Sequence, residues 1–164
     1  MKHTIAILVE DHPGVMARVA GLFTRRGFNI ESIAVGPSEK TGISRMTIIT
    51  SGDEKVLEQV TKQLNKLIDV IRVRDISPGN IIERELILVR VHTDSLPIRA
   101  EIIQLVEIFK AKVVYVERNT VTIELSGDEE KVSGFIKLLE PFGIIETVRT
   151  GRIAIARTKA NGNA

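Results

Sequence analysis

The chain has 164 residues, 43% of them hydrophobic and 4% aromatic, and its 23 Lys and Arg residues nearly balance 21 Asp and Glu residues. This supplies the core of one ordinary domain or two small ones, and a net charge of +2 is too small to indicate nucleic-acid binding. Without cysteine, disulfides, thiol nucleophiles and thiolate metal sites are excluded. No apolar stretch is long enough to span a bilayer, so we expect a cytoplasmic protein with no membrane partner.

The first half of the chain predicts the order strand, helix, strand, strand, helix, strand. Alternating or β-rich apolar runs predict strands at 4–9, 28–35, 43–50 and 70–76. Pro13 suits the first turn of one helix, Gly27 ends it, and Asp53 opens the other. Residues at helical spacing mark the buried faces: Val15, Val19, Leu22 and Phe23, then Val56, Val60, Leu64 and Leu67.

The second half predicts the same order after a linker at 77–80. Strands are expected at 82–91, 113–116, 121–125 and 144–148, with an extra strand at 153–156. Two helices are marked by Ile98, Ile102, Leu105 and Phe109, and by Val132, Phe135, Ile136 and Leu139. We therefore expect one domain over 1–77, a second over 81–158, and a disordered tail at 159–164.

The two halves also share a short motif. Residues 51–56 (SGDEKV) recur with one added Glu at 126–132 (SGDEEKV). Turn and helix-cap chemistry alone could produce this match, but the flanking patterns agree as well. The predicted fold class is α+β, with two tandem ferredoxin-like βαββαβ modules, each with helices on one sheet face. The other face needs cover, which favours a homo-oligomer or a partner.

Catalytic and metal-binding patterns are missing from the sequence. His3, His12 and His92 lack metal-ligand spacing, and no nucleotide-binding or nucleophile motif occurs. Glu10 and Asp11 are adjacent, and adjacent strand residues point to opposite faces, which does not suit acid–base catalysis. We expect no active site and no metal site.

The junction before the first helix has the features of a ligand site. A helix N-terminus attracts a carboxylate, Gly14 permits close approach to the backbone, and Asp11 could accept hydrogen bonds from an ammonium group. These features match a free α-amino acid; the alternative is that Asp11 or His12 caps the helix. Asn29, after Gly27, is a second candidate, or ordinary turn chemistry.

Two groups of arginines have open interpretations. Arg45 lies in an otherwise apolar strand, where it could face solvent or make an interface contact. The basic run from Arg149 through Arg152 and Arg157 to Lys159 contains no acid. We expect that run to be a solvated terminal face.

Several segments resemble a known family. They are 25–33 (RRGFNIESI), 43–47 (ISRMT), 54–64 (EKVLEQVTKQL), 83–89 (ERELILV), 107–109 (EIF) and 149–151 (RTG). In this order they resemble the small regulatory subunit of acetohydroxyacid (acetolactate) synthase, whose first module is an ACT domain. The resemblance implies a non-catalytic subunit that activates a catalytic large subunit and confers feedback inhibition by valine in branched-chain amino acid biosynthesis.

The same resemblance implies partners and site residues. Thiamine diphosphate, Mg and FAD are expected on the catalytic subunit and no cofactor on this chain. ACT domains would pair in a homodimer and bind valine, or another branched-chain amino acid, between them. The matching positions are Asp11, Gly14, Val15, Asn29 and Ile30. Asp11 replaces a common Asn; its charge suits an ammonium and opposes a carboxylate, which leaves the effector's identity open.

Two other functions compete with this interpretation. A free-standing ACT-type sensor could regulate another biosynthetic enzyme or a transcription factor, although the second module resembles the synthase subunit in particular. An RNA-binding module is possible on ferredoxin-like sheets, but a single tyrosine and no paired sheet aromatics disfavour it. We therefore expect no nucleic-acid partner.

Overall fold

A computed structural model describes residues 1–77 and 81–157, which form two compact units. The first unit contains Met1–Ile82 and the stretch that begins at Arg152, and the second contains Glu83–Gly151. No helix in these described ranges is both long and apolar enough to cross a membrane.

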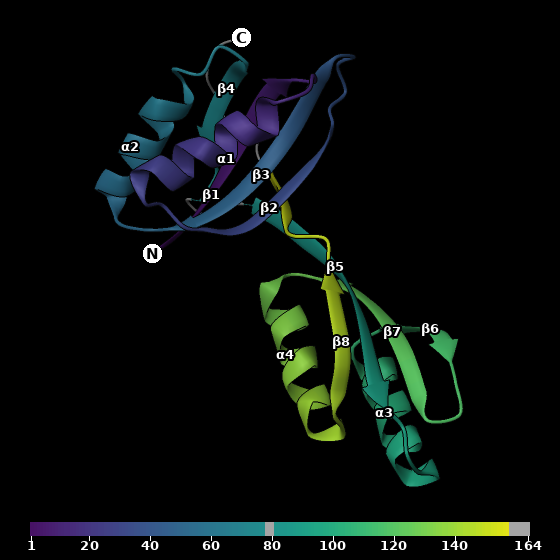
Figure 1. Ribbon diagram of the computed structural model, residues 1–164. Coiled ribbons are helices and arrows are strands. Elements are labelled where there is room, and N and C mark those ends of the chain that lie inside the picture. Colours follow the sequence, from purple (N-terminus) through teal and green to yellow (C-terminus); the bar gives the residue numbers. More distant parts are fainter. Residues whose placement is uncertain (78–80, 158–164) are drawn as a thin grey trace. The chain divides into compact units, whose positions relative to one another are not determined.

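The first unit is a four-stranded antiparallel sheet with two helices on one face (Figure 1). Its sheet order is β2-β3-β1-β4. In chain order the elements are β1 (Lys2–Glu10), α1 (Val15–Arg26), β2 (Ile30–Pro37), β3 (Ile43–Ser51), α2 (Glu54–Leu64) and β4 (Val70–Asp75). This is the βαββαβ order, with β2 and β4 at the two edges.

The core of the first unit lies between the sheet and the helices. It joins the inward residues of β1 and β3, such as Ile7 and Met46, to the apolar face of α1, on which Val19 and Phe23 are 1% exposed. Residues spaced by four and seven positions share one side of a helix, so the sequence periodicity places this face on the sheet. The start of α1 is therefore held close to the end of β1.

The second unit repeats this topology. Four strands of its sheet have the order β6-β7-β5-β8, and α3 and α4 lie on one face (Figure 1). The elements are β5 (Ile81–His92), α3 (Leu96–Ile108), β6 (Lys112–Val116), β7 (Thr120–Gly127), α4 (Glu129–Leu139), a 3₁₀ turn η1 (Glu140–Phe142) and β8 (Ile144–Arg149). Its core includes the Phe109–Phe135 ring pair, with centroids 5.1 Å apart. The predicted fold class, two tandem ferredoxin-like modules, is confirmed.

The shared Ser-Gly-Asp motif performs the same local task in both units. The Asp53 carboxylate accepts a hydrogen bond from the Val56 N–H at 2.9 Å, and Asp128 accepts one from the Lys131 N–H at 2.9 Å. The preceding glycines allow close packing, because a Cβ on Gly52 would lie 2.6 Å from a Val56 methyl. Both units share the βαββαβ topology, and the need to cap the second helix of each unit accounts for the recurrence of the Ser-Gly-Asp motif.

The last strand, β9 (Ile153–Ala156), is part of the second sheet by its hydrogen bonds, while its contacts group it with the first compact unit. The second domain predicted over 81–158 includes this strand and stays a prediction, since the contacts within the chain divide the two compact units at Gly151. β9 pairs with β5, and Ala154 packs with Ala6, Ile76 and Ile81 on the sheet face away from the helices. Part of the cover expected from a homo-oligomer or a partner is therefore supplied by the chain itself. Residues 78–80 of the predicted linker and the predicted tail at 159–164 lie outside the described residues.

Replacing either cap aspartate should destabilise the unit that contains it. We expect Asp53→Ala and Asp128→Ala each to lower the free energy of unfolding by about 1 kcal/mol, because an N-terminal N–H of α2 or α4 loses its acceptor. Asp53→Asn and Asp128→Asn are the matched controls and should cost little, since Asn caps nearly as well. Urea unfolding followed by circular dichroism measures both; equal losses for Ala and Asn would contradict the capping role.

Candidate functional site

A hollow of about 400 Å³ opens where β1 meets α1. Its lining comes from the end of β1, the 10–14 connection, the start of α1, and the facing parts of β2 and β3: Val9, Glu10, Asp11, His12, Pro13, Gly14, Val15, Met16, Val35, Ser44 and Met46. The predicted residues Asp11, Gly14 and Val15 are all in this lining. Asp11 and Gly14 are exposed, whereas the Val15 side chain is in the core.

No side chain caps α1 at this end. The N-cap residue is Gly14, at φ 91° and ψ −13°, a left-handed conformation that glycine adopts without strain. Neither Asp11 nor His12 caps the helix, so the alternative considered for them does not apply. The first N–H groups of a helix have no acceptor within the helix. The Val15 N–H donates to the His12 carbonyl at 3.5 Å. The N–H groups of Met16 and Ala17 and the positive end of the helix dipole are available to an anionic group at the hollow.

The 10–14 connection is fixed by backbone contacts on two sides. The Asp11 N–H donates to the Gly42 carbonyl at 2.9 Å, and the Glu10 N–H donates to the Asp69 carbonyl at 2.9 Å. These bonds tie it to the turn before β3 and to the residue before β4. The Asp11 carboxylate itself has no hydrogen-bond partner within 1–77 or 81–157. It is therefore free to meet a ligand.

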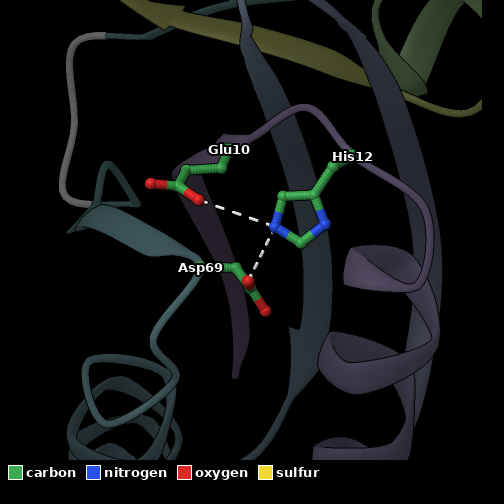
Figure 2. A group of neighbouring side chains, drawn as sticks. All are labelled: Glu10, His12 and Asp69. Carbon is green, nitrogen blue, oxygen red and sulfur yellow. Dashed lines mark ion pairs between the residues drawn. The ribbon is translucent and has the colours of Figure 1, made fainter.

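A buried carboxylate organises the side chains around this connection. Asp69, whose side chain is 6% exposed, lies 2.9 Å from His12 Nε2 through Oδ1 and 2.5 Å from Arg18 Nε through Oδ2. Figure 2 shows one nitrogen of the His12 ring facing both Asp69 and Glu10, and the Glu10 carboxylate is 3.5 Å from this Nε2. A buried charge is tolerated only when it is paired, so Asp69 links the connection to the first turns of α1.

The ion pair sets the protonation of Asp69. The Arg18 guanidinium holds the pKa of Asp69 below its usual value, and the contact with His12 acts in the same direction against the opposing effect of burial. Asp69 therefore remains charged throughout the neutral range. The Arg18 guanidinium also lies near Gly14, with Nη1 3.5 Å from the position a Cβ would occupy there.

The cluster of Glu10, His12 and Asp69 also has the geometry of metal ligands, since one donor atom from each lies within 4.8 Å of the others. Asp69 already faces a guanidinium, however, and a cation bound there would have to compete with Arg18. The arrangement is therefore explained as a fixed ion-pair network. Sequence spacing missed Asp69 and Arg18; the only available signal was a single acid in the apolar run 67–71.

The predicted residues Asn29 and Ile30 lie at the other end of α1. That helix has 12 residues and spans about 18 Å, with Asp11 before its start and Asn29 after its end. Ile30 packs on the first core, and the Asn29 carbonyl accepts a hydrogen bond from the Thr50 hydroxyl at 2.7 Å. The Asn29 amide has no partner within the described part of the chain. One copy therefore does not bring the five predicted residues together.

Comparison with known proteins agrees with this architecture. Residues 5–72 match the family model of the ACT domain of acetohydroxyacid synthase small subunits, and residues 84–158 match the model described as "Small subunit of acetolactate synthase". A Methanothermobacter thermautotrophicus protein named "Probable acetolactate synthase small subunit" is 57% identical over 155 residues, which cover 94% of this chain and 92% of that protein. The acetolactate synthase small subunit of Mycolicibacterium smegmatis is 48% identical, with 94% and 91% covered.

A solved structure gives the same result. The acetolactate synthase small subunit from Thermotoga maritima superposes with a TM-score of 0.89 at 44% identity, covering 98% of this chain and 99% of that one. Fold and comparisons together define an ACT-domain regulatory protein. The chain belongs to the family of acetolactate synthase small subunits.

Removing the charge of Asp69 should destabilise the first unit in a pH-dependent way. A lowered pKa in the folded state stabilises the protein above the unfolded value of about 4, and this contribution is lost as the pH falls through the folded value. We expect Asp69→Asn to unfold at a lower temperature than the wild type at pH 7, with the difference shrinking below pH 4. Asp11→Asn is the matched control and should change little. A difference that stayed constant with pH would contradict the ion-pair explanation.

Proposed function

We propose that this chain is the non-catalytic regulatory subunit that activates a catalytic acetolactate synthase subunit and confers feedback inhibition by valine. Membership of the small-subunit family supports a catalytic acetolactate synthase subunit as the partner. Thiamine diphosphate, Mg and FAD would all be bound by that catalytic subunit. The observation that carries the effector proposal is the hollow at the uncapped start of α1, with the unpaired Asp11 carboxylate on its wall.

The chemistry of the hollow suits an aliphatic α-amino acid. Asp11 would accept hydrogen bonds from the ammonium group, and the N–H groups at the start of α1 would receive the carboxylate. Met16 and Val35, each 43% exposed, offer apolar surface to a branched side chain. The charge of Asp11 opposes a carboxylate placed next to it, so the ligand would lie with its ammonium end toward Asp11.

The separation of the predicted residues supports a site shared by two copies. Asp11, Gly14 and Val15 lie before or at the start of α1, and Asn29 and Ile30 lie beyond its end. β2, which follows Asn29, is an edge strand and contributes Val35 to the hollow. In a homodimer paired through the first units, the Asn29 end of one copy would complete the Asp11 end of its partner. Valine would then favour one dimer arrangement, and the catalytic subunit would respond through its differential affinity for the two arrangements.

A complementation experiment tests the shared site. Asp11→Ala and Asn29→Ala homodimers should each bind no valine, because every site in them lacks one group. In a mixed dimer, both changes fall in one site and the other site is intact, so titration calorimetry should recover one valine per two chains. Gln59→Ala, on α2, serves as the control and should bind as the wild type does. Failure of the mixed dimer to bind would show that the two residues do not share a site.

Changing Gly14 should separate inhibition from activation. Gly14→Asp places bulk and negative charge at the helix start, where the ligand carboxylate would bind, and we expect valine inhibition of the reconstituted synthase to be lost while activation is retained. Gly14→Ala carries the same backbone strain at φ 91° without the charge, and we expect it to weaken inhibition less. Acetolactate formation with and without valine, leucine and isoleucine measures both and identifies the effector. If valine inhibited the Gly14→Asp variant as strongly as the wild type, the assignment of the valine site to the hollow would be wrong.

A further inference from the structure

The stretch 152–156, here called the return segment, is bound to the first unit at several points. The Arg152 N–H donates to the Ser32 hydroxyl oxygen at 2.9 Å, and Arg45 Nη2 donates to the Ala154 carbonyl at 3.0 Å. Arg152 is 8% and Ala154 6% exposed, so the solvated face expected for this basic run is wrong at Arg152. Arg45, whose role the sequence left open, is a contact to this segment.

These anchors lie behind the hollow. Ser32 is on β2 and Arg45 on β3, the two strands that supply Val35, Ser44 and Met46 to its lining. Arg45 lies between Ser44 and Met46, and adjacent strand residues point to opposite faces. A shift of β2 or β3 at the hollow therefore displaces Ser32 or Arg45 and changes the hydrogen bonds that hold the return segment.

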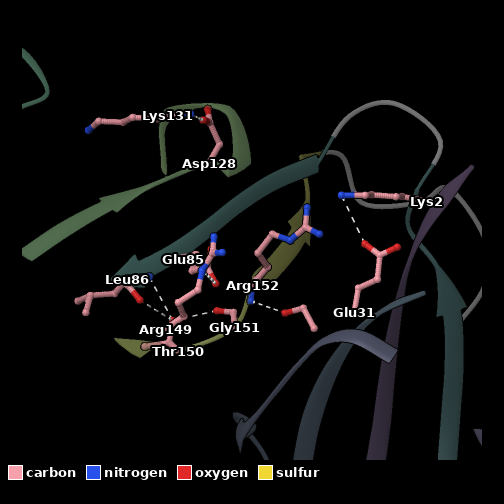
Figure 3. A network of polar contacts seen from close by, with 11 residues as sticks. Lys2, Glu31, Glu85, Leu86, Asp128, Lys131, Arg149, Thr150, Gly151 and Arg152 are labelled. Atoms are coloured by element: carbon pink, nitrogen blue, oxygen red, sulfur yellow. Dashed lines mark hydrogen bonds and ion pairs between the residues drawn. The ribbon is translucent and has the colours of Figure 1, made fainter. Parts of the chain in front are cut away.

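The other end of this connection is fixed within the second unit. Arg149 forms a two-point ion pair with the buried Glu85, at 2.8 Å from Nη2 to Oε2 and 3.2 Å from Nε to Oε1 (Figure 3). The Thr150 N–H donates to the Leu86 carbonyl at 3.1 Å, and the Leu86 N–H donates to Thr150 Oγ1 at 3.1 Å. Only Gly151 then separates a residue fixed in the second unit from one fixed in the first.

We propose that the return segment couples the effector hollow of the first unit to the second unit, with Arg45 and Ser32 as positioning residues. This inference rests on the proposed function, because it states how valine binding at the hollow would reach the rest of the subunit. A connection of one residue between two hydrogen-bonded anchors leaves little slack. Rearrangement of β2 and β3 must therefore move the end of β8 or break an anchor.

The first test removes the Arg45 anchor. In Arg45→Ala, we expect valine binding measured by titration calorimetry to stay within about threefold of wild type, because Arg45 is not in the lining of the hollow. The valine concentration that half-inhibits the reconstituted synthase should rise by about tenfold, while activation without valine is unchanged. Arg72→Ala is the matched control: Leu8 pairs with Arg45 on one side and Arg72 on the other, so both arginines are on the same sheet face. It should behave as the wild type does.

The second test keeps both anchors and adds slack. Inserting Gly-Ser-Gly between Gly151 and Arg152 lengthens the connection by about 10 Å, and we expect the same loss of inhibition with binding and activation retained. Agreement between this insertion and Arg45→Ala supports coupling through the segment, and if one of the two variants folds poorly the other tests the coupling by itself.

The remaining outcomes count against the proposal. Wild-type inhibition in both variants would overturn it, and loss of activation together with inhibition would assign the segment to assembly instead. If the wild-type protein itself binds no valine and is not inhibited by it, the proposed function fails first. Calorimetry on the wild type distinguishes that case from a failure of coupling alone.

Discussion

The first unit depends on how the buried carboxylate of Asp69 is neutralised. Asp69 precedes β4, His12 follows β1 and Arg18 lies in α1, so one side chain joins three parts of the chain that meet only in the folded state. The geometry of the β1–α1 connection follows from this pairing. Because Asp69 fixes that connection from outside the hollow, the helix start can remain without a side-chain cap. Local stability thus comes from a neighbouring contact, and the N–H groups of Met16 and Ala17 remain available for binding.

The two units share a topology but differ in the chemistry at the first helix. α1 begins at a left-handed glycine with no side-chain cap, whereas α3 begins at Ser95, whose hydroxyl accepts the Ile98 N–H. A capped helix start has already used part of its capacity to bind an anion. This difference agrees with the effector site proposed for the first unit. The two units therefore have the same topology, but only the first has a first helix that begins without a side-chain cap.

The sequence predicted the elements well because their signals are local. The spacing of Val15, Val19, Leu22 and Phe23 determines which face of α1 is buried, and Asp53 and Asp128 act within four residues of their own position. The turn before α1, at Asp11 and Gly14, was equally visible, because a turn that opens a helix has a local composition.

Other features could not be predicted because they depend on distant segments. Asp69 acquires its role from residues 51 and 57 positions earlier, and β9 reads as a strand without indicating which unit it joins. In the sequence Arg149 is one of several basic residues, and its role follows only from Glu85, which is far away in sequence and forms an ion pair with it. In each case a side chain's charge or apolarity was evident, but its partner was determined by tertiary structure.

The position of β9 has a consequence for biosynthesis. The chain leaves the first unit at Ile82, forms the whole second unit, and returns at Arg152, so the second unit is an insertion within the first. A ribosome completes β9 only after every residue of the second unit has been made, and domains fold largely in the order of their synthesis. The patch around Ala6 and Ile76 therefore stays uncovered by Ala154 until translation nears its end. A nascent chain stalled before Arg152 would expose that apolar patch, which makes incomplete products recognisable to chaperones and proteases.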